Sequence, residues 1–229
     1  ERIDVFIATG REPADVLRYS KELGLTTPQL CDGGANILDP VRLVSTWTAP
    51  LGPANAEAVV TRLREMGSAF VATHGSGTAS TFDDVPDWDL IRVSALDLDE
   101  ATADALAEEF RGNKEMYVIK AVLPYNGLWA IDFTLAGVDK ATGVARVGDT
   151  LGVDPANMVA VGDSYNDLPM LSMVGDPCAI NPDGRLRHHA KEQGWRIRDY
   201  RTGRKAARAG LVVGAAAGAV SGTVAAGVA

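Results

Sequence analysis

The sequence predicts an α/β protein that carries a second, smaller α+β domain within it. At both ends of the chain, short apolar runs alternate with amphipathic helical segments, which is typical of a parallel sheet. Residues 49–136 change to the order α-β-β-α-β-β, which favours an antiparallel sheet with helices on one face. We therefore expect residues 1–48 and 137–200 to form the core, residues 49–136 the inserted domain, and residues 201–229 a basic linker with a Gly/Ala-rich apolar tail.

In the two core segments, helices and strands are predicted from apolar runs and from the Pro and Gly residues that bound them. Ile3 to Ala8 predicts a strand, and the next segment predicts a helix with Pro13 in its first turn and Gly24 at its end. The remaining core elements are predicted as strand 29–31, turn 32–36, hairpin 37–44, helix 140–152, strand 158–161, helix 168–174, strand 177–180, helix 186–193 and strand 195–197.

The inserted segment begins with a helix from Pro53 to Met66, whose apolar residues fall on one face. Strands are predicted at residues 69–73, 90–94, 116–123 and 129–135. A second helix runs to Phe110, with Asp99 suited to its N-cap.

Charge and cysteine content limit the classes of partner and compartment. The net charge is −8, although residues 185–208 hold nine basic side chains against two acidic ones, so the rest of the chain is strongly acidic. An acidic body argues against nucleic acid as a partner. Cys31 and Cys178 lie in apolar segments without metal-ligand spacing, which indicates buried thiols in a reducing, cytoplasmic setting.

The C-terminal tail allows two interpretations. Residues 211–229 contain no charged side chain, and Gly214, Gly218 and Gly222 follow the small-xxx-small spacing of membrane helices. One interpretation is a membrane-associated tail with the preceding basic cluster on the cytoplasmic side. The other is a low-complexity, frayed tail, because Ala and Gly give little transfer energy.

The stretch from Gly162 to Asp167 carries the strongest chemical signal. A short apolar strand leads into it, so Asp163 and Asp167 would lie at the carboxyl edge of the sheet, where open α/β sheets bind ligands. Two neighbouring carboxylates suit a hard cation such as Mg²⁺. The alternative is an acidic loop in which Asn166 caps the next helix.

Two further features point to a phosphate. Thr9 ends a predicted strand with Gly10 behind it, so a hydroxyl and backbone amides could face an anion. Lys140 opens a predicted helix, where its charge and the helix dipole would both attract phosphate. Each residue alone fits a turn or a solvated surface, but together with a metal they describe a phosphoryl-transfer site.

Three motifs, in this order, resemble those of the haloacid-dehalogenase (HAD) superfamily of phosphatases. Val5 to Arg11 resembles the second motif, Val138-Asp139-Lys140 the third, and Val161 to Asp167 the fourth. The position and order of the insertion resemble the C2-type cap of subclass IIB, which includes sugar phosphatases and phosphomannomutases. The resemblance implies a Rossmann-like, three-layer core with an α+β cap.

The same resemblance implies roles for individual residues. Thr9 and Lys140 would be catalytic, Thr9, Gly10, Arg11, Lys140 and Asn166 would bind phosphate, and Asp163 and Asp167 would bind Mg²⁺. The substrate would be a small phosphorylated metabolite, in this subclass a sugar or polyol phosphate.

The chain departs from the family pattern at the first motif. Asp-x-Asp-Gly-Thr, whose first Asp is the nucleophile, does not occur before Thr9. Asp97-Leu98-Asp99 has similar letters but follows a cap strand and lacks Gly-Thr. Gly33 also stands where the family often has Asn. We therefore expect a nucleophile upstream of this chain and little phosphatase activity from the chain alone; the alternatives are a sugar phosphomutase and a non-catalytic, membrane-tethered HAD-like module.

Overall fold

A computed structural model describes residues 3–123 and 125–200 of the chain. The chain divides into two compact units, residues 1–155 and 156–229. The predictions for residues 201–229 lie outside the described residues. Within the described part, no helix is both long and apolar enough to cross a membrane.

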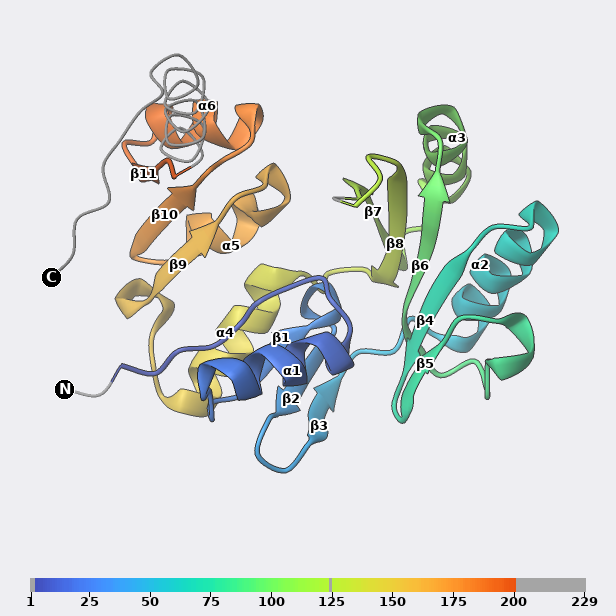
Figure 1. The fold of residues 1–229 in the computed structure, drawn as a ribbon, viewed down its shortest axis with the longest axis horizontal. Coiled ribbons are helices and arrows are strands. Elements are labelled where there is room, and N and C mark those ends of the chain that lie inside the picture. Colours follow the sequence, from blue (N-terminus) through green and yellow to red (C-terminus); the bar gives the residue numbers. More distant parts are fainter. Residues whose placement is uncertain (1–2, 124, 201–229) are drawn as a thin grey trace, which may run out of the picture. The chain divides into compact units, whose positions relative to one another are not determined.

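The first unit begins with helix α1 and a small antiparallel sheet (Figure 1). Its elements are α1 (Pro13–Leu23), β1 (Gln29–Cys31), a single 3₁₀ turn (Asp32–Gly34), β2 (Asn36–Asp39) and β3 (Val44–Thr48). The strands pair in the order β1-β2-β3. The predicted helix and strand 29–31 are confirmed, whereas the hairpin predicted at residues 37–44 extends to Thr48.

The prediction of a strand from Ile3 to Ala8 is wrong. Among the described residues, the strand pairing of this segment is limited to an isolated parallel bridge between Ala8 and Leu30. Ile3 and Val5 are 83% and 51% exposed, so no second strand covers them within residues 3–123 and 125–200. A strand needs partners for its backbone groups, and one short contact with β1 does not provide a ladder.

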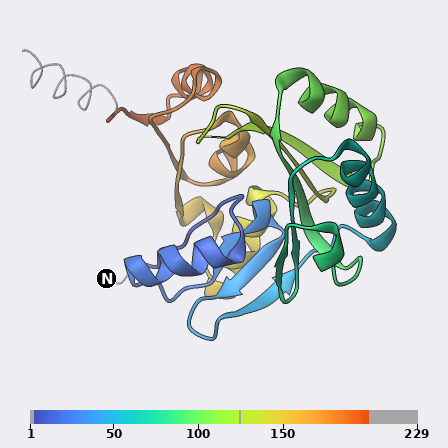
Figure 2. The ribbon, with the colours of Figure 1, turned by 45° about the vertical axis from the view of Figure 1, so that its right-hand side comes forward.

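The inserted segment forms a separate five-stranded sheet with the order β5-β4-β6-β8-β7, in which every pairing is antiparallel. Its elements are α2 (Pro53–Met66), β4 (Phe70–His74), β5 (Gly77–Ala79), a 3₁₀ turn (Phe82–Asp84), β6 (Leu90–Leu98), α3 (Glu100–Phe110), β7 (Met116–Val122) and β8 (Trp129–Leu135). The short strand β5 is an addition to the predicted order. Figure 2 shows both helices on the same side of the sheet.

The core of this sheet lies between the strands and the two helices. Phe133, Val93 and Ala72 are cross-strand neighbours on the helix-facing side and are fully buried with Leu63 and Leu106 of the helices. Burying each large apolar side chain contributes about 1.5–3 kcal/mol. Asp99 caps α3 through a hydrogen bond from the Thr102 amide (2.9 Å), as the sequence predicts.

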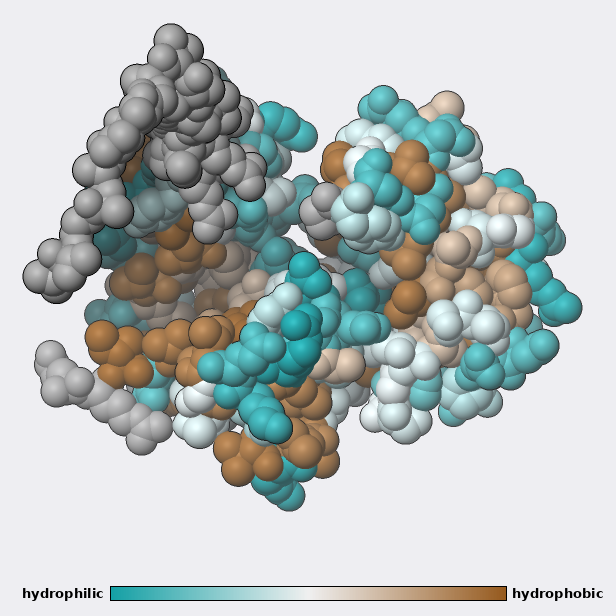
Figure 3. All heavy atoms as spheres, viewed as in Figure 1, coloured by the Kyte–Doolittle hydropathy of each residue, from teal (hydrophilic) through white to brown (hydrophobic). Residues whose placement is uncertain are grey.

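The chain then returns to the first small sheet through α4 (Lys140–Leu151). This helix packs on β1 across Gly143, where an added Cβ would lie 2.5 Å from Leu30 Cδ1. Figure 3 shows an apolar surface at the tip of the β2–β3 hairpin, where Val41 and Leu43 are exposed.

The second unit contains a parallel sheet of the order β11-β10-β9. Its elements are a 3₁₀ turn at its start (Pro155–Asn157), β9 (Val159–Gly162), a 3₁₀ turn (Tyr165–Asp167), α5 (Leu168–Met173), β10 (Asp176–Ile180), α6 (Gly184–Glu192) and β11 (Arg196–Arg198). The acidic stretch therefore follows the carboxyl end of a parallel strand, as predicted.

Candidate phosphate and metal site

Thr9 directly follows Ala8, the residue that bridges to Leu30 of β1. Its amide donates to the Leu30 carbonyl (3.1 Å), and its own carbonyl accepts from the Gly33 amide (3.0 Å). The Thr9 hydroxyl oxygen accepts a hydrogen bond from the Arg11 amide (3.2 Å). Since a hydroxyl is both an acceptor and a donor, this contact leaves the Thr9 proton for another acceptor, such as a phosphoryl oxygen.

The side chain of Arg11 is directed along α1. Its guanidinium forms an ion pair with Asp15 (2.7 Å) and lies over the Tyr19 ring, 5.8 Å from the ring centroid. Hydrogen bonds from Arg18 and then Arg11 lower the pKa of Asp15. Arg11 therefore contributes its backbone amide to the turn at Thr9, while its charge is held by a carboxylate.

Lys140 is the first residue of α4, at the positive end of the helix dipole. Asp139 is the N-cap and accepts from the Thr142 amide (2.9 Å), while the Thr142 hydroxyl accepts from the Asp139 amide (3.0 Å). This reciprocal capping fixes the first turn of the helix, and with it the backbone of Lys140.

One short turn connects the two predicted phosphate-binding elements. Gly33 bonds to Thr9, and the next residue, Gly34, packs so closely on the start of α4 that an added Cβ would lie 2.0 Å from the Asp139 carbonyl oxygen. Gly34 also has φ +113°, a conformation that L side chains rarely adopt. The structure thus brings the Thr9 segment and the N-terminus of α4 to consecutive residues of the same turn.

Asp32, the first residue of this turn, is completely buried, and its surroundings were not predicted. Its carboxylate accepts from the Thr73 hydroxyl (3.0 Å) and the Asn36 amide group (3.2 Å), and its Oδ1 lies 3.1 Å from Nε of Arg92. Burial raises the pKa of Asp32, and Arg92 opposes that rise. Thr73 and Arg92 come from distant elements of the chain, so nothing local to Asp32 indicates these contacts.

The side of the inserted sheet that faces away from α2 and α3 is polar. Thr73 pairs with Arg92 across β4 and β6, and Ser94 pairs with Asp132 across β6 and β8. Arg92 Nη1 lies 3.5 Å from Asp132, so this cation is shared between two carboxylates. Lys120 lies on the opposite, helix side of the sheet, beside Asp104 and over the Trp129 ring.

The acidic motif of the second unit has its own set of hydrogen bonds. The Asp163 carbonyl accepts from the Asp183 amide (2.9 Å), and the Asp183 carboxylate accepts from the Tyr165 amide (2.6 Å). Asp183 also caps α6 through the Leu186 amide (2.8 Å). Asp163 is exposed, and its backbone is tied to the start of α6.

Asp167 and Asn166 lie in the turn that follows. Asp167 is 6% exposed, and its carboxylate lies against Gly162, where an added Cβ would approach Oδ2 to 2.8 Å. The Asn166 amide is bound by the Ser164 hydroxyl (3.2 Å), so Ser164 caps this turn, not Asn166. The Asp163 and Asp167 carboxylates are hard oxygen donors that fit Mg²⁺. Among residues 3–123 and 125–200, no group of three or more acidic, His or Cys side chains could hold a metal ion.

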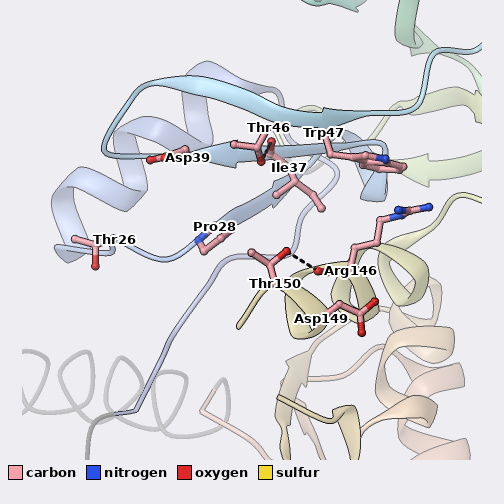
Figure 4. Close-up of a pocket in the computed structure, with 9 residues that line it drawn as sticks. All are labelled: Thr26, Pro28, Ile37, Asp39, Thr46, Trp47, Arg146, Asp149 and Thr150. Carbon is pink, nitrogen blue, oxygen red and sulfur yellow. Dashed lines mark hydrogen bonds between the residues drawn. The ribbon is translucent and has the colours of Figure 1, made fainter. Parts of the chain in front are cut away.

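A separate cavity of ≈ 450 Å³ lies between the β2–β3 hairpin and α4 (Figure 4). Trp47 and Arg146 face each other there, with the guanidinium 4.2 Å from the ring centroid. The cavity is lined by Thr26, Pro28, Ile37, Asp39, Thr46, Trp47, Arg146, Asp149 and Thr150. These residues do not include the ones predicted to bind phosphate.

The family model that matches this sequence is described as haloacid dehalogenase-like hydrolase, and it matches residues 1–83 and 73–192. A phosphoglycolate phosphatase of Halorubrum lacusprofundi is 32% identical over 189 residues, which are 81% of this chain and 74% of that protein. The phosphoserine phosphatase SerB1 of Mycobacterium tuberculosis is 50% identical over 92 residues, 40% of this chain. The chain spans only about a third of that relative (30%) and of a similar Mycobacterium leprae hydrolase (32%).

Solved structures show the same fold at low sequence identity. A haloacid dehalogenase-like hydrolase from B. subtilis superposes with a TM-score of 0.69 at 16% identity, covering 81% of this chain and 80% of that one. A HAD subclass IIB sugar phosphatase superposes with a TM-score of 0.66 at 14% identity, covering 86% and 80%. The α/β core with an inserted α+β cap is therefore the fold of this chain.

Proposed function

This chain belongs to the haloacid dehalogenase-like hydrolases, and on that premise we propose that it forms the phosphate- and metal-binding part of a Mg²⁺-dependent phosphomonoester hydrolase. The observation that carries the proposal is the 32–34 turn, which joins the Thr9 segment to the N-terminus of α4. Relatives named phosphoglycolate phosphatase and phosphoserine phosphatase support a phosphatase activity. Two backbone elements that attract anions, tied to one turn, suit a phosphate group.

In this proposal each predicted residue has one task. The Thr9 hydroxyl and the amides of Gly10 and Arg11 donate to the phosphoryl oxygens, and Lys140 neutralises their charge. Asn166 is proposed as a further phosphate donor. Asp163 and Asp167 would hold Mg²⁺, which supplies charge neutralisation when bound.

The nucleophile is proposed to come from outside the given sequence. An Asp carboxylate oxygen bonds to phosphorus as the ester oxygen leaves and takes up a proton from a second acid. Water then cleaves the resulting acyl phosphate, returning the carboxylate and releasing inorganic phosphate. Asp97 and Asp99 do not fill this role, since Asp97 accepts from Tyr125 (2.9 Å) and Asp99 caps α3.

The proposed substrate is a small sugar or polyol phosphate. The polar face of the cap sheet offers hydroxyl and carboxylate groups, and its Arg92 is already shared by Asp32 and Asp132. Such a surface suits a neutral leaving group rich in hydroxyls better than a carboxylate or a second phosphate, because each additional anion needs a cation. The same argument disfavours the alternative of a phosphomutase, which must hold a bisphosphate.

The division of the chain is also a proposal. The separate antiparallel sheet supports a cap at residues 49–136 and a core at 1–48 with 137–200. Buried Cys31 and Cys178 support a reducing, cytoplasmic setting. Membrane association through residues 211–229 and a non-catalytic module remain the alternatives. An Asp-x-Asp-Gly-Thr run within about 30–40 residues upstream of Glu1 would support the enzyme over the non-catalytic module. About that length of chain holds one parallel strand and its crossover connection to the next.

The test measures the binding of inorganic phosphate to the full chain by calorimetry, with and without Mg²⁺. Thr9→Val and Lys140→Met should each weaken binding roughly 10-fold, because a charge-assisted hydrogen bond contributes about 1.5–3 kcal/mol. Lys21→Met, an exposed cation at the end of α1, is the matched control and should change nothing.

The chain alone should show little Mg²⁺-dependent hydrolysis of p-nitrophenyl phosphate. Turnover that survives in the chain would place the nucleophile inside it and overturn the proposed mechanism. Absence of phosphate binding in the unsubstituted chain would overturn the proposed function itself.

A further inference from the structure

Arg92 of the cap sheet reaches the backbone of the Thr9 loop. It lies on β6, is 7% exposed, and points away from the helices because its cross-strand partner Thr73 does so. Its Nη1 donates a hydrogen bond to the carbonyl of Gly10, 82 residues earlier in the chain. This contact joins the inserted segment to the loop that follows Thr9.

The Gly10–Arg11 peptide unit bears two contacts, one at each end. Its C=O accepts from Arg92, and its N–H donates to the Thr9 hydroxyl oxygen (3.2 Å). In a trans peptide these two groups point in opposite directions and lie in one plane. Fixing the carbonyl therefore fixes the direction from which the amide approaches Thr9.

Arg92 is itself held from two sides. Asp32 lies 3.1 Å from Nε, and Asp132 lies 3.5 Å from Nη1. Asp32 also bonds to the same loop through its backbone, since its amide donates to the Arg11 carbonyl (3.0 Å). The guanidinium has little freedom, so it can act as a rigid support.

We propose that Arg92 is a positioning residue that orients the Thr9 hydroxyl toward a phosphoryl oxygen by holding the Gly10–Arg11 peptide. The amide occupies one lone pair of the Thr9 oxygen, which directs its proton away from Arg11 and toward the anion. Because Arg92 comes from the inserted segment, the placement of the cap sheet and the phosphate-binding hydroxyl are coupled. This inference rests on the proposed function, in which Thr9 binds phosphate.

The experiment is a double-mutant cycle for binding of inorganic phosphate to the full chain. Arg92→Met is made together with Asp32→Asn, so that no buried carboxylate is left without its cation. This Met/Asn pair should lower phosphate affinity roughly 10-fold in the natural background, and by less than 2-fold when Thr9 is already Val. Equal losses in both backgrounds would show that Arg92 acts on phosphate independently of Thr9 and would overturn the inference.

A second readout needs no ligand. Hydrogen exchange of the Arg11 amide should become at least 10-fold faster in the Met/Asn pair, since its peptide loses one anchor. Lys120→Met is the matched control, because it removes a cap cation from the opposite face of the sheet and should leave the Arg11 amide unchanged. An unchanged Arg11 amide in the Met/Asn pair would refute the inference.

Two further results separate the possible failures. Arg92→Lys keeps one donor for Gly10 and the charge beside Asp32, so it should restore most of the binding and the protection of Arg11. It also provides a folded variant if the Met/Asn pair does not fold, and full loss in Arg92→Lys with native folding would count against the inference. If the unsubstituted chain binds no phosphate while Arg11 responds to Arg92, the proposed function fails and the positioning contact stands.

Discussion

Gly34 lies against Asp139 at a distance that no other residue would allow. An added Cβ would stand 2.0 Å from the Asp139 carbonyl oxygen and 3.0 Å from the Lys140 nitrogen. Both neighbours are backbone atoms of a capped helix end, so neither has a rotamer through which to move away. Contact between the turn and α4 thus depends on this glycine.

Gly34→Ala should destabilise the chain by about 3 kcal/mol, from the clash together with the φ of +113°. Gly33→Ala is the matched control: Gly33 has φ +71° but open space around its Cβ position, so only the backbone strain of about 1–2 kcal/mol remains. Urea denaturation of the two variants measures the difference. Equal losses would show that the close approach to Asp139 does not govern the packing of α4.

Elements with local signals were predicted well from the sequence. Helix Pro53–Met66 was predicted with its observed bounds because its apolar residues fall on one face. Lys140 was predicted at the start of α4, where Asp139 caps the helix. Such signals lie within the element itself and need no knowledge of the tertiary fold.

Features that depend on distant residues were not predicted. The Ile3–Ala8 strand failed because a strand exists only with neighbours, and the sequence does not display them. The contact of Asp32 with Arg92 joins a turn to a separate sheet across 60 residues, and nothing local to Asp32 indicates it. The roles of Thr9, Lys140, Asp163 and Asp167 in binding remain predictions.

Cys31 should not react with thiol reagents in the folded chain. It is fully buried, and burial first, with the neighbouring Asp32 next, raises the pKa of its thiol. Because the thiolate is the reactive form, iodoacetamide at pH 8 should label Cys31 only after unfolding in urea. Peptide mapping by mass spectrometry checks this, and labelling in the native protein at the rate of a free thiol would contradict the buried position.

Because Asp32 can be protonated, the stability that is lost in Arg92→Met should depend on pH. Burial raises the pKa of Asp32 above its unfolded value of about 3.9, so its favourable contribution to folding is full below that value and declines as pH rises through the folded pKa. Arg92 lowers this pKa, and Asp132 faces the same guanidinium, while Thr73, Asn36 and Cys31 are the other groups at the Asp32 carboxylate. Arg92→Met should therefore raise the pKa of Asp32 further.

The expected result is a destabilisation by Arg92→Met that grows as pH rises through the range from the unfolded pKa of Asp32 to its folded pKa in the variant. Each pKa unit by which the two proteins differ corresponds to about 1.4 kcal/mol. Chemical denaturation of both proteins across this range gives the difference. Arg92→Met with Asp32→Asn is the control and should lose the part of the rise that comes from Asp32. If the loss of unfolding free energy in Arg92→Met does not change with pH, the pKa of Asp32 does not depend on Arg92 and the prediction is wrong.

Gly162→Ala should disturb Asp167 more than it disturbs the fold. The added Cβ would meet Oδ2 and Cβ of Asp167 at 2.8 and 2.9 Å, and a side chain can move where a backbone cannot. We expect a loss of about 1–2 kcal/mol in unfolding free energy and, if Asp167 binds the cation, roughly 10-fold weaker Mg²⁺ binding. Gly184→Ala, at the first position of α6 with open space around it, is the matched control and should alter neither property. Calorimetric titration of Mg²⁺ against the three proteins distinguishes the outcomes, because a displaced ligand changes affinity while a purely structural Asp167 leaves it equal in all three.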